Sequence, residues 1–276
     1  MRWLQFILSH SIFISLCALS LCFQTLQLLH VKNDPYLFGL VFFATLSSYN
    51  FYWLISKYHF SQDLSLAEFL VKNISNLLLF ILASAGVLYC MLSLPSIGMY
   101  ISVAVLLTLL YSVPLWPFRV FAFARKVGFL KTILLAFTWA YVTVVIPVAH
   151  VKAINGTALA LLFTARFLFM LMLCIIFDSR DIAVDKIHSL RSLATDVSTH
   201  ALQRIMAVVF ILYLLSGCLL RWYFDDTAQL VAFIITGLVT RWVYRLSLKK
   251  QGYFFYYFIV DGLMLFSATA TFVASI

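Results

Sequence analysis

Nine apolar segments follow one another along the chain, and their length constrains the fold more than any other feature. A helix crosses the hydrocarbon core of a bilayer with about 20 residues, and each segment is close to that length. We therefore predict an all-α, polytopic membrane protein with nine transmembrane helices in a single domain, residues 1–276. The segments lie near 4–27, 36–56, 75–93, 98–117, 129–149, 157–177, 203–220, 228–247 and 253–275.

The composition also indicates a membrane protein. Hydrophobic residues make up 64% of the chain and charged residues 11%, whereas soluble domains are about a quarter charged. The first apolar segment lacks a small-residue cleavage site and leads into further segments, so we interpret it as a transmembrane helix and not as a signal peptide. Arg166 falls inside a segment, and we expect its long side chain to reach the outer surface of the membrane.

The patterns of several functional classes do not occur in the chain. The five cysteines lie in apolar segments and form no CxxC pair, and the six histidines are scattered without an HExxH pattern. Zinc sites and a disulfide framework are therefore not expected. There is no GxxxxGKS-type nucleotide loop and no nucleic-acid-binding module, so no nucleic-acid partner is predicted. We ascribe the net charge of +9 to membrane topology instead.

The distribution of lysine and arginine predicts the orientation in the membrane. Loops on the cytoplasmic side carry an excess of these residues. Fifteen of the 19 lie at the N-terminus or in loops on its side, whereas the opposite side has only Lys32, Lys152 and Arg221. We therefore place the N-terminus in the cytoplasm and the C-terminus outside, and we expect the protein in the plasma (inner) membrane.

A weak internal duplication relates the two halves of the chain. The loops after the second and sixth segments are both long and polar, and each opens with a polar residue at the end of a helix. These residues are Asn50 and Asp178. The pattern predicts two four-helix halves with a ninth helix added, and Asn50 and Asp178 facing each other across the mouth of a central cavity.

Three aspartates follow the sixth segment and form the strongest candidate site. If that helix continues, the spacings of Asp178, Asp181 and Asp185 place their carboxylates on one face. Close like charges repel unless a cation lies among them, and ligand sets made only of oxygen suit Mg²⁺. Arg180 and Lys186 alternate with the acids, as expected where a metal ion and a diphosphate are held together. The alternative is a solvated helix end with ordinary charge pairs.

With its nine helices and this acidic motif, the chain resembles the UbiA superfamily of membrane prenyltransferases. In that family the motif after the sixth helix reads DxxDxxxD, then Lys or Arg, then a Thr-Leu or Ser-Leu pair. The corresponding residues here are Asp178, Asp181, Asp185, Lys186 and the run 191–194 (RSLA). The segment YSVP at 111–114, with the basic residues that follow it, resembles the family's Tyr-Pro and basic segment. Asp261-Gly262, early in the last helix, also fits the group.

The family's first acidic motif, NDxxDxxxD at the end of the second helix, is degenerate in this chain. Anchoring the pattern on Asn50 places Phe51, Leu54 and Tyr58 where three aspartates are expected. In the family the two motifs face each other and hold Mg²⁺ ions that bridge a prenyl diphosphate. The resemblance therefore implies the family fold, with half of the metal-binding carboxylates absent.

The resemblance implies a Mg²⁺-dependent enzyme that moves an isoprenoid chain from a prenyl diphosphate to a hydrophobic acceptor in the bilayer. Asp178, Asp181 and Asp185 would bind the metal, with Asn50 as a further catalytic residue. The implied substrate-binding residues are Arg119, Lys126, Lys131, Lys186 and Tyr111. Aromatic faces would stabilise an allylic carbocation, unless they only form an interfacial belt. These aromatics are Tyr49, Tyr52, Trp53 and Tyr111.

Two other hypotheses stay open at this point. The loss of the first acidic motif favours a catalytically impaired relative that binds an isoprenoid lipid without ionising it. A third possibility is a membrane lipid transporter or an enzyme of the CDP-alcohol phosphotransferase type. The chain has no DGxxAR segment before Asp178, which argues against the phosphotransferase. Nine Gly and five Pro across nine segments argue against the broken helices of a transporter.

Overall fold

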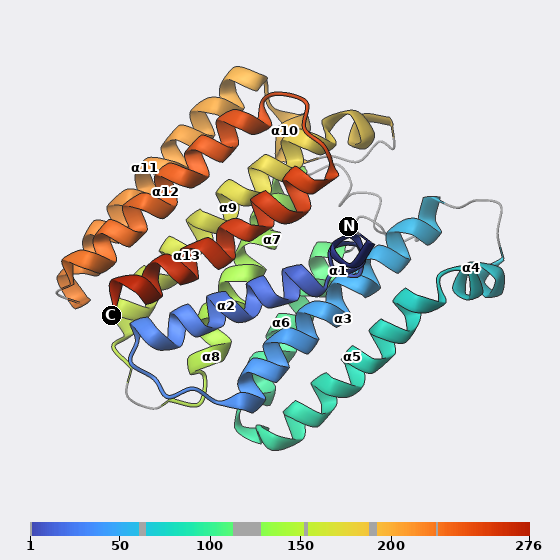
Figure 1. Cartoon of the computed structure of the whole chain (residues 1–276), viewed down its shortest axis with the longest axis horizontal. Coiled ribbons are helices and arrows are strands. Elements are labelled where there is room, and N and C mark those ends of the chain that lie inside the picture. Colours follow the sequence, from blue (N-terminus) through green and yellow to red (C-terminus); the bar gives the residue numbers. More distant parts are fainter. Residues whose placement is uncertain (1, 61–64, 113–127, 152–153, 188–191, 225) are drawn as a thin grey trace.

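The computed structural model describes the whole chain except residues 1, 61–64, 113–127, 152–153, 188–191 and 225. Throughout this described part the regular structure is helical, and it contains no strand (Figure 1). The all-α prediction is confirmed. The N-terminus and the C-terminus lie at opposite ends of the bundle (Figure 1).

Most helices coincide with the predicted apolar segments. Two short stretches, η5 and η6, are π-helical, and η1 is a 3₁₀ turn. In chain order the elements are α1 (Arg2–Ser9), α2 (Ile12–Leu28), α3 (Pro35–Phe60), α4 (Leu66–Lys72), α5 (Ile74–Ser93), η1 (Pro95–Ile97), α6 (Gly98–Ser112), α7 (Gly128–Ala140), η5 (Tyr141–Val145), α8 (Ile146–Val148), α9 (Gly156–Ile187), α10 (Leu193–Asp196), α11 (Thr199–Phe224), α12 (Thr227–Ser247), η6 (Phe255–Val260) and α13 (Asp261–Ala274).

The number of membrane crossings differs from the predicted nine. Among the described residues, seven helices are long and apolar enough to cross a bilayer, or eight if the bent pair α1 and α2 makes one crossing. That pair bends by 69° where Ser11 adopts a left-handed backbone with φ of 62°. The fourth predicted segment forms only a shorter apolar helix, Pro95–Tyr111, and its predicted end lies outside the described residues. The nine-helix count is therefore not confirmed, and the two four-helix halves stay a prediction.

Helix α9 is the central element of the bundle. Within its apolar part, Gly156–Asp181, 67% of the most apolar 18-residue stretch is buried inside the bundle. The corresponding share for α5 is 17%. Helix α9 packs against α7 on one side and α11 on another, and it also contacts α12. Helix α2 also reaches α9, through the bonds from Arg166 to its Leu21 and Thr25, and α2 in turn lies against both α3 and α13 (Figure 1). The acidic motif thus lies at the end of the most enclosed helix.

Polar side chains join helices that are far apart in the sequence. Gln24 of α2 donates to Thr271 Oγ1 of α13 at 2.7 Å, and Gln229 of α12 donates to the Thr271 carbonyl at 3.0 Å. Thr25 of α2 donates to the carbonyl of Thr143 in η5 at 2.7 Å. Bonds of this kind contribute about 0.6 kcal/mol each in a membrane protein. They therefore specify which helices are neighbours more than they add stability.

Arg166 does not reach the membrane surface, so that expectation is wrong. Its side chain is only 4% exposed and turns inward to α2. One guanidinium nitrogen donates to the Leu21 carbonyl at 3.3 Å and to Thr25 Oγ1 at 3.4 Å. A charge in the hydrocarbon region is costly unless protein groups solvate it. Here the backbone and the hydroxyl of α2 replace the water that an exposed arginine would have.

Candidate functional site

Asp178 is held by a hydroxyl from a neighbouring helix. Thr132, near the start of α7, is 2% exposed and donates to Asp178 Oδ2 at 2.5 Å. The same hydroxyl accepts a bond from the backbone N–H of Leu193 in α10 at 3.3 Å. A single threonine therefore links α7, α9 and α10 at this position. Sequence reasoning missed Thr132, because no local pattern distinguishes it from other threonines in apolar helices.

Asp181, one turn further along α9, forms a two-pronged ion pair with Arg180. Arg180 donates from Nε to Asp181 Oδ1 at 2.6 Å and from Nη2 to Oδ2 at 2.7 Å. The guanidinium carbon also lies 5.1 Å from each of three ring centroids, those of Phe177, Tyr256 and Tyr257. An arginine over aromatic faces gains electrostatic attraction from each ring. This contact fastens the end of α9 to η6.

The continuation of α9 to Ile187 meets the condition on which the acidic motif was predicted. By helical geometry, Asp178, Asp181 and Asp185 then share one face. The side chains of Asp185 and Lys186 lie outside the described residues, as do Arg119 and Lys126 altogether. Among the side chains that are described, no three His, Cys, Asp or Glu residues gather as a metal site. The triad therefore stays a prediction.

Asn50 lies in the contact between α3, α5 and the α1–α2 turn. It is fully buried, and its amide nitrogen donates to the carbonyl of Leu46 at 2.8 Å and to that of His10 at 3.3 Å. Its amide oxygen accepts a bond from Asn76 of α5 at 3.1 Å. A metal ion could use that oxygen only by sharing it with Asn76. The catalytic role of Asn50, and its position opposite Asp178, stay predictions.

The residues that replace the first acidic motif are used for packing. Phe51 stacks on Phe80 of α5 with centroids 5.7 Å apart, and Tyr58 meets Phe69 of α4 edge-on at 5.3 Å. Leu54 is buried, with 8% exposure. Phe51 thus packs against α5, and Tyr58 packs against α4. Aromatic side chains suit this role because they bury a large apolar area.

A different pair on α3 meets the aromatic residues of the central helices. Tyr49 lies edge-on to Trp139 of α7 at 6.1 Å, and Tyr52 stacks on Tyr111 of α6 at 4.9 Å. Tyr49 and Tyr52 are three residues apart and share a helix face. The structure therefore brings Tyr111, a predicted substrate-binding residue, next to the aromatic face of α3.

Cys174 shows that the acidic motif and these aromatic residues adjoin one interior region. Its sulfur, one turn before Asp178, lies within electrostatic range of Asp178, Lys131 and Asp261. Tyr49 is within range of Asp261 and Cys174, and Tyr111 is within range of Tyr49 and Cys174. Lys131, predicted to bind substrate, is therefore brought close to the end of α9.

Asp261 is an acidic residue in this region to which sequence analysis gave no role. It is 7% exposed, and within the described chain it makes no hydrogen bond or ion pair. It directly follows the π-helical turn η6. Such turns are rare and occur frequently at functional sites. A carboxyl group inside a membrane-spanning segment was the available signal, since such groups are costly and usually functional.

The donor set at the end of α9 is compatible with Mg²⁺. Asp178 and Asp181 provide carboxylate oxygens on successive turns of one helix, and hard divalent cations prefer such ligands. Both are oriented by neighbours, Asp178 by Thr132 and Asp181 by Arg180. Ligands with such outer partners bind metals more tightly. Arg180 contacts both oxygens of Asp181, so a metal ion would have to share this carboxylate with a cation.

Comparison with solved structures identifies the fold. A UbiA homolog from Aeropyrum pernix K1 aligns with a TM-score of 0.61 and 12% identity, covering 96% of this chain and 97% of that protein. A digeranylgeranylglyceryl phosphate synthase aligns with a TM-score of 0.55 and 15% identity, covering 100% and 99%. No protein-family profile and no curated protein sequence matches the chain significantly. The predicted resemblance to the UbiA superfamily is therefore confirmed at the level of the fold.

Proposed function

We propose that this protein is a UbiA-type membrane prenyltransferase, which moves an isoprenoid chain from a prenyl diphosphate to a hydrophobic acceptor. The observation that carries the proposal is the position of Asp178 one helical turn from Cys174, which lies within electrostatic range of Tyr49 and Tyr111. The similarity of fold to a digeranylgeranylglyceryl phosphate synthase supports it, because that protein's name describes the synthesis of a lipid with isoprenoid chains.

In this proposal, Asp178, Asp181 and Asp185 hold Mg²⁺. When bound, Mg²⁺ supplies positive charge to the departing diphosphate and so stabilises the transition state. Thr132 orients Asp178 for this task through the 2.5 Å bond. Basic side chains bind the remaining diphosphate oxygens; one of them is Lys131, which lies within electrostatic range of Cys174 on α9. The other proposed ligands are Arg119, Lys126 and Lys186.

The aromatic residues stabilise the isoprenoid carbocation that forms when the diphosphate leaves. Breaking the allylic carbon–oxygen bond leaves a delocalised carbocation, and each aromatic face contributes about 0.5–2 kcal/mol to its stability. Tyr52 and Tyr111 offer stacked rings, and Trp139 lies beside Tyr49. These bulky groups also exclude water, which would otherwise capture the cation.

Asp261 accepts the proton that the acceptor loses. When the new bond forms between the isoprenoid carbon and the acceptor, a proton leaves the acceptor and needs a base. Asp261 is buried beside the same interior and has no competing hydrogen bond within the described chain. The diphosphate leaves with the bonding electrons, and the proton passes to the ionised form of Asp261, which the positive charge of Arg180 stabilises.

The absence of acids from the end of α3 predicts slow turnover. The carboxylates of α9 must then hold all of the metal ions that neutralise the departing diphosphate. In the family that the chain resembles, two acidic motifs share this task. Each 1.36 kcal/mol of lost transition-state stabilisation lowers the rate tenfold. The second candidate function, an isoprenoid-binding protein without catalysis, is favoured by the same observation. We expect turnover below about 1 s⁻¹, the lower end of the range for typical enzymes.

The test is a single-turnover assay with radiolabelled geranylgeranyl diphosphate and protein in nanodiscs, with and without Mg²⁺. We expect Mg²⁺-dependent binding followed by slow release of diphosphate. Binding without release would favour the non-catalytic function. Binding that is unaffected by removal of Mg²⁺ would contradict the proposed transferase, because it assigns the diphosphate to a metal held by α9.

A further inference from the structure

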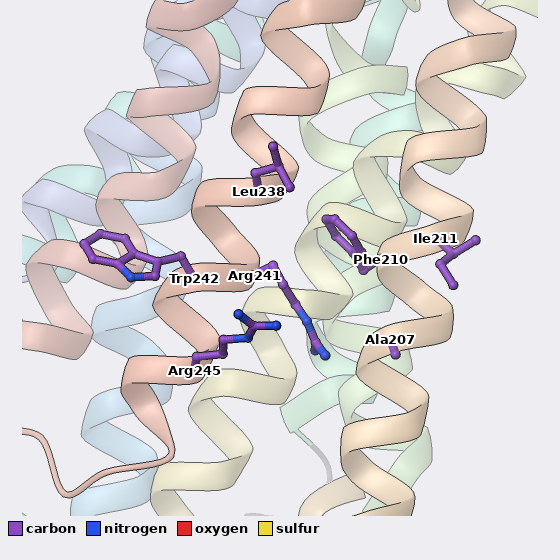
Figure 2. Close-up of a pocket in the computed structure, with 7 residues that line it drawn as sticks. All are labelled: Ala207, Phe210, Ile211, Leu238, Arg241, Trp242 and Arg245. Atoms are coloured by element: carbon purple, nitrogen blue, oxygen red, sulfur yellow. The ribbon is translucent and has the colours of Figure 1, made fainter.

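A groove with two arginines lies between α11 and α12, away from the site at the end of α9. It has a volume of about 390 Å³. Figure 2 shows Arg241 and Arg245 extending from α12 toward α11, on the side where Ala207 lies. The lining residues are Ala207, Phe210, Ile211, Leu238, Arg241, Trp242 and Arg245.

The groove lies at the same end of the bundle as the acidic motif. Arg241 and Arg245 belong to the last two turns of α12, and the chain then passes through Lys249 and Lys250 to η6. Tyr256 of η6 contacts Arg180 at the end of α9. The charge distribution predicts that this end faces the cytoplasm.

The guanidinium groups of the two arginines are not neutralised by any acidic side chain among the described residues. Within the described part of the chain, neither guanidinium forms an ion pair or a hydrogen bond. Nη1 of Arg241 is buried without a partner, although its guanidinium carbon lies 5.3 Å from the ring of Tyr244. A buried donor without a partner is costly, and like charges four residues apart on a helix repel. An anion between the two side chains would remove both penalties.

The walls of the groove are apolar and open outward. Ile211, Leu238 and Trp242 are 55%, 54% and 61% exposed, as expected for side chains that face lipid. The exposed face of each helix stays apolar toward the opposite end of the bundle, with Leu215 on α11 and Ile235 on α12. A ligand in this groove would therefore meet two cations at one end and an apolar track beyond them.

We propose that this groove binds an anionic phospholipid, with its phosphate between Arg241 and Arg245 and an acyl chain along α11 and α12. Arginine binds phosphate oxygens through a planar fork of N–H donors. Basic pockets between transmembrane helices on the cytoplasmic side are recognised sites for anionic headgroups. The exposed tryptophan at this depth fits the interfacial region. Such a lipid would stabilise the pairing of α11 with α12.

Native mass spectrometry of the full chain in detergent tests the proposal. The protein is incubated with equal amounts of phosphatidylglycerol and phosphatidylcholine, and the bound lipid is counted. We expect the parent to retain phosphatidylglycerol preferentially. The double variant Arg241→Gln/Arg245→Gln should retain about 10-fold less or lower still, in line with two lost charge contacts. Arg221→Gln, at the opposite end of α11, should bind lipid like the parent.

Two further variants keep the test decisive if the double variant folds poorly. Arg245→Gln alone removes an exposed charge, and Ala207→Trp fills the groove without changing its charge. Both should lower phosphatidylglycerol binding while Mg²⁺-dependent binding of prenyl diphosphate persists. Equal retention of both lipids by the parent, or undiminished phosphatidylglycerol on these variants, would overturn the proposal. Displacement of the lipid by millimolar inorganic phosphate would also overturn it, because the occupant would then be a free anion.

Discussion

The C-terminal turns of α9 and those of α3 carry opposite chemistry. On α9, Asp178 and Asp181 are held by Thr132 and Arg180. On α3, Tyr49 and Tyr52 meet the central aromatic residues, and Phe51 packs on α5. Under the proposed function, α9 would bind the charged diphosphate and α3 would provide an apolar, aromatic wall for the isoprenoid chain.

The largest effect on rate should come from Asp261, the proposed proton acceptor. It belongs neither to the diphosphate-binding end of α9 nor to the aromatic wall of α3. Asp261→Asn removes the base while keeping the size of the side chain. Loss of a general base lowers a rate about 10²- to 10⁴-fold. We expect single-turnover transfer to fall by that factor, with the dissociation constant of the prenyl diphosphate unchanged. A variant that weakens binding and leaves the rate of bound substrate intact would show that Asp261 acts structurally.

Thr132→Val tests whether the orientation of Asp178 matters. The substitution keeps the shape of the side chain but removes the donor to Asp178, and loss of such an outer partner weakens metal binding about 10- to 100-fold. The measurement is the Mg²⁺ concentration needed for half-maximal binding of prenyl diphosphate. Thr138→Val is the matched control, since among the described residues Thr138 bonds only to the Leu134 carbonyl of its own helix. Thr132→Ser should restore most of the affinity. Equal effects at Thr132 and Thr138 would mean that α7 is merely destabilised.

The smallest effect should come from the aromatic wall. Tyr52→Leu removes the ring that stacks on Tyr111, and one cation–π contact of about 0.5–2 kcal/mol corresponds to a rate loss of about 2- to 30-fold. Phe51→Leu, on the adjacent position that contacts α5, should lower the melting temperature without changing the rate of bound substrate. If Phe51→Leu slows transfer as much as Tyr52→Leu, the two faces of α3 do not differ in function.

The sequence allowed the all-helical architecture and the helical acidic motif to be predicted, because both depend on local features. Segment length identifies a helix that crosses a membrane, and fixed spacing places Asp178 and Asp181 on one face of α9. These inferences need no knowledge of which helices become neighbours.

The partners of individual side chains could not be predicted in this way. In a membrane both the lipid-facing and the buried surfaces of a helix are apolar, so periodicity does not reveal which face turns inward. Arg166 was therefore expected at the surface but binds α2, and the bonding of Asn50 to Asn76 could not be inferred. The break at Ser11 follows from a left-handed backbone at one residue, which the apolar pattern does not signal.

The most direct test of the central claim, that the carboxylates of α9 hold the metal on which diphosphate binding depends, is a calorimetric titration of geranylgeranyl diphosphate. Parent and Asp178→Asn/Asp181→Asn proteins are compared in nanodiscs with and without Mg²⁺. Asp226→Asn serves as the control, because Asp226 caps the start of α12 at the opposite end and asparagine caps equally well. We predict that the parent and the control bind with Mg²⁺ only, whereas the double variant stays folded and loses this Mg²⁺-dependent binding. Binding by the double variant with the affinity and Mg²⁺ dependence of the parent would contradict the claim and leave the motif as a solvated helix end.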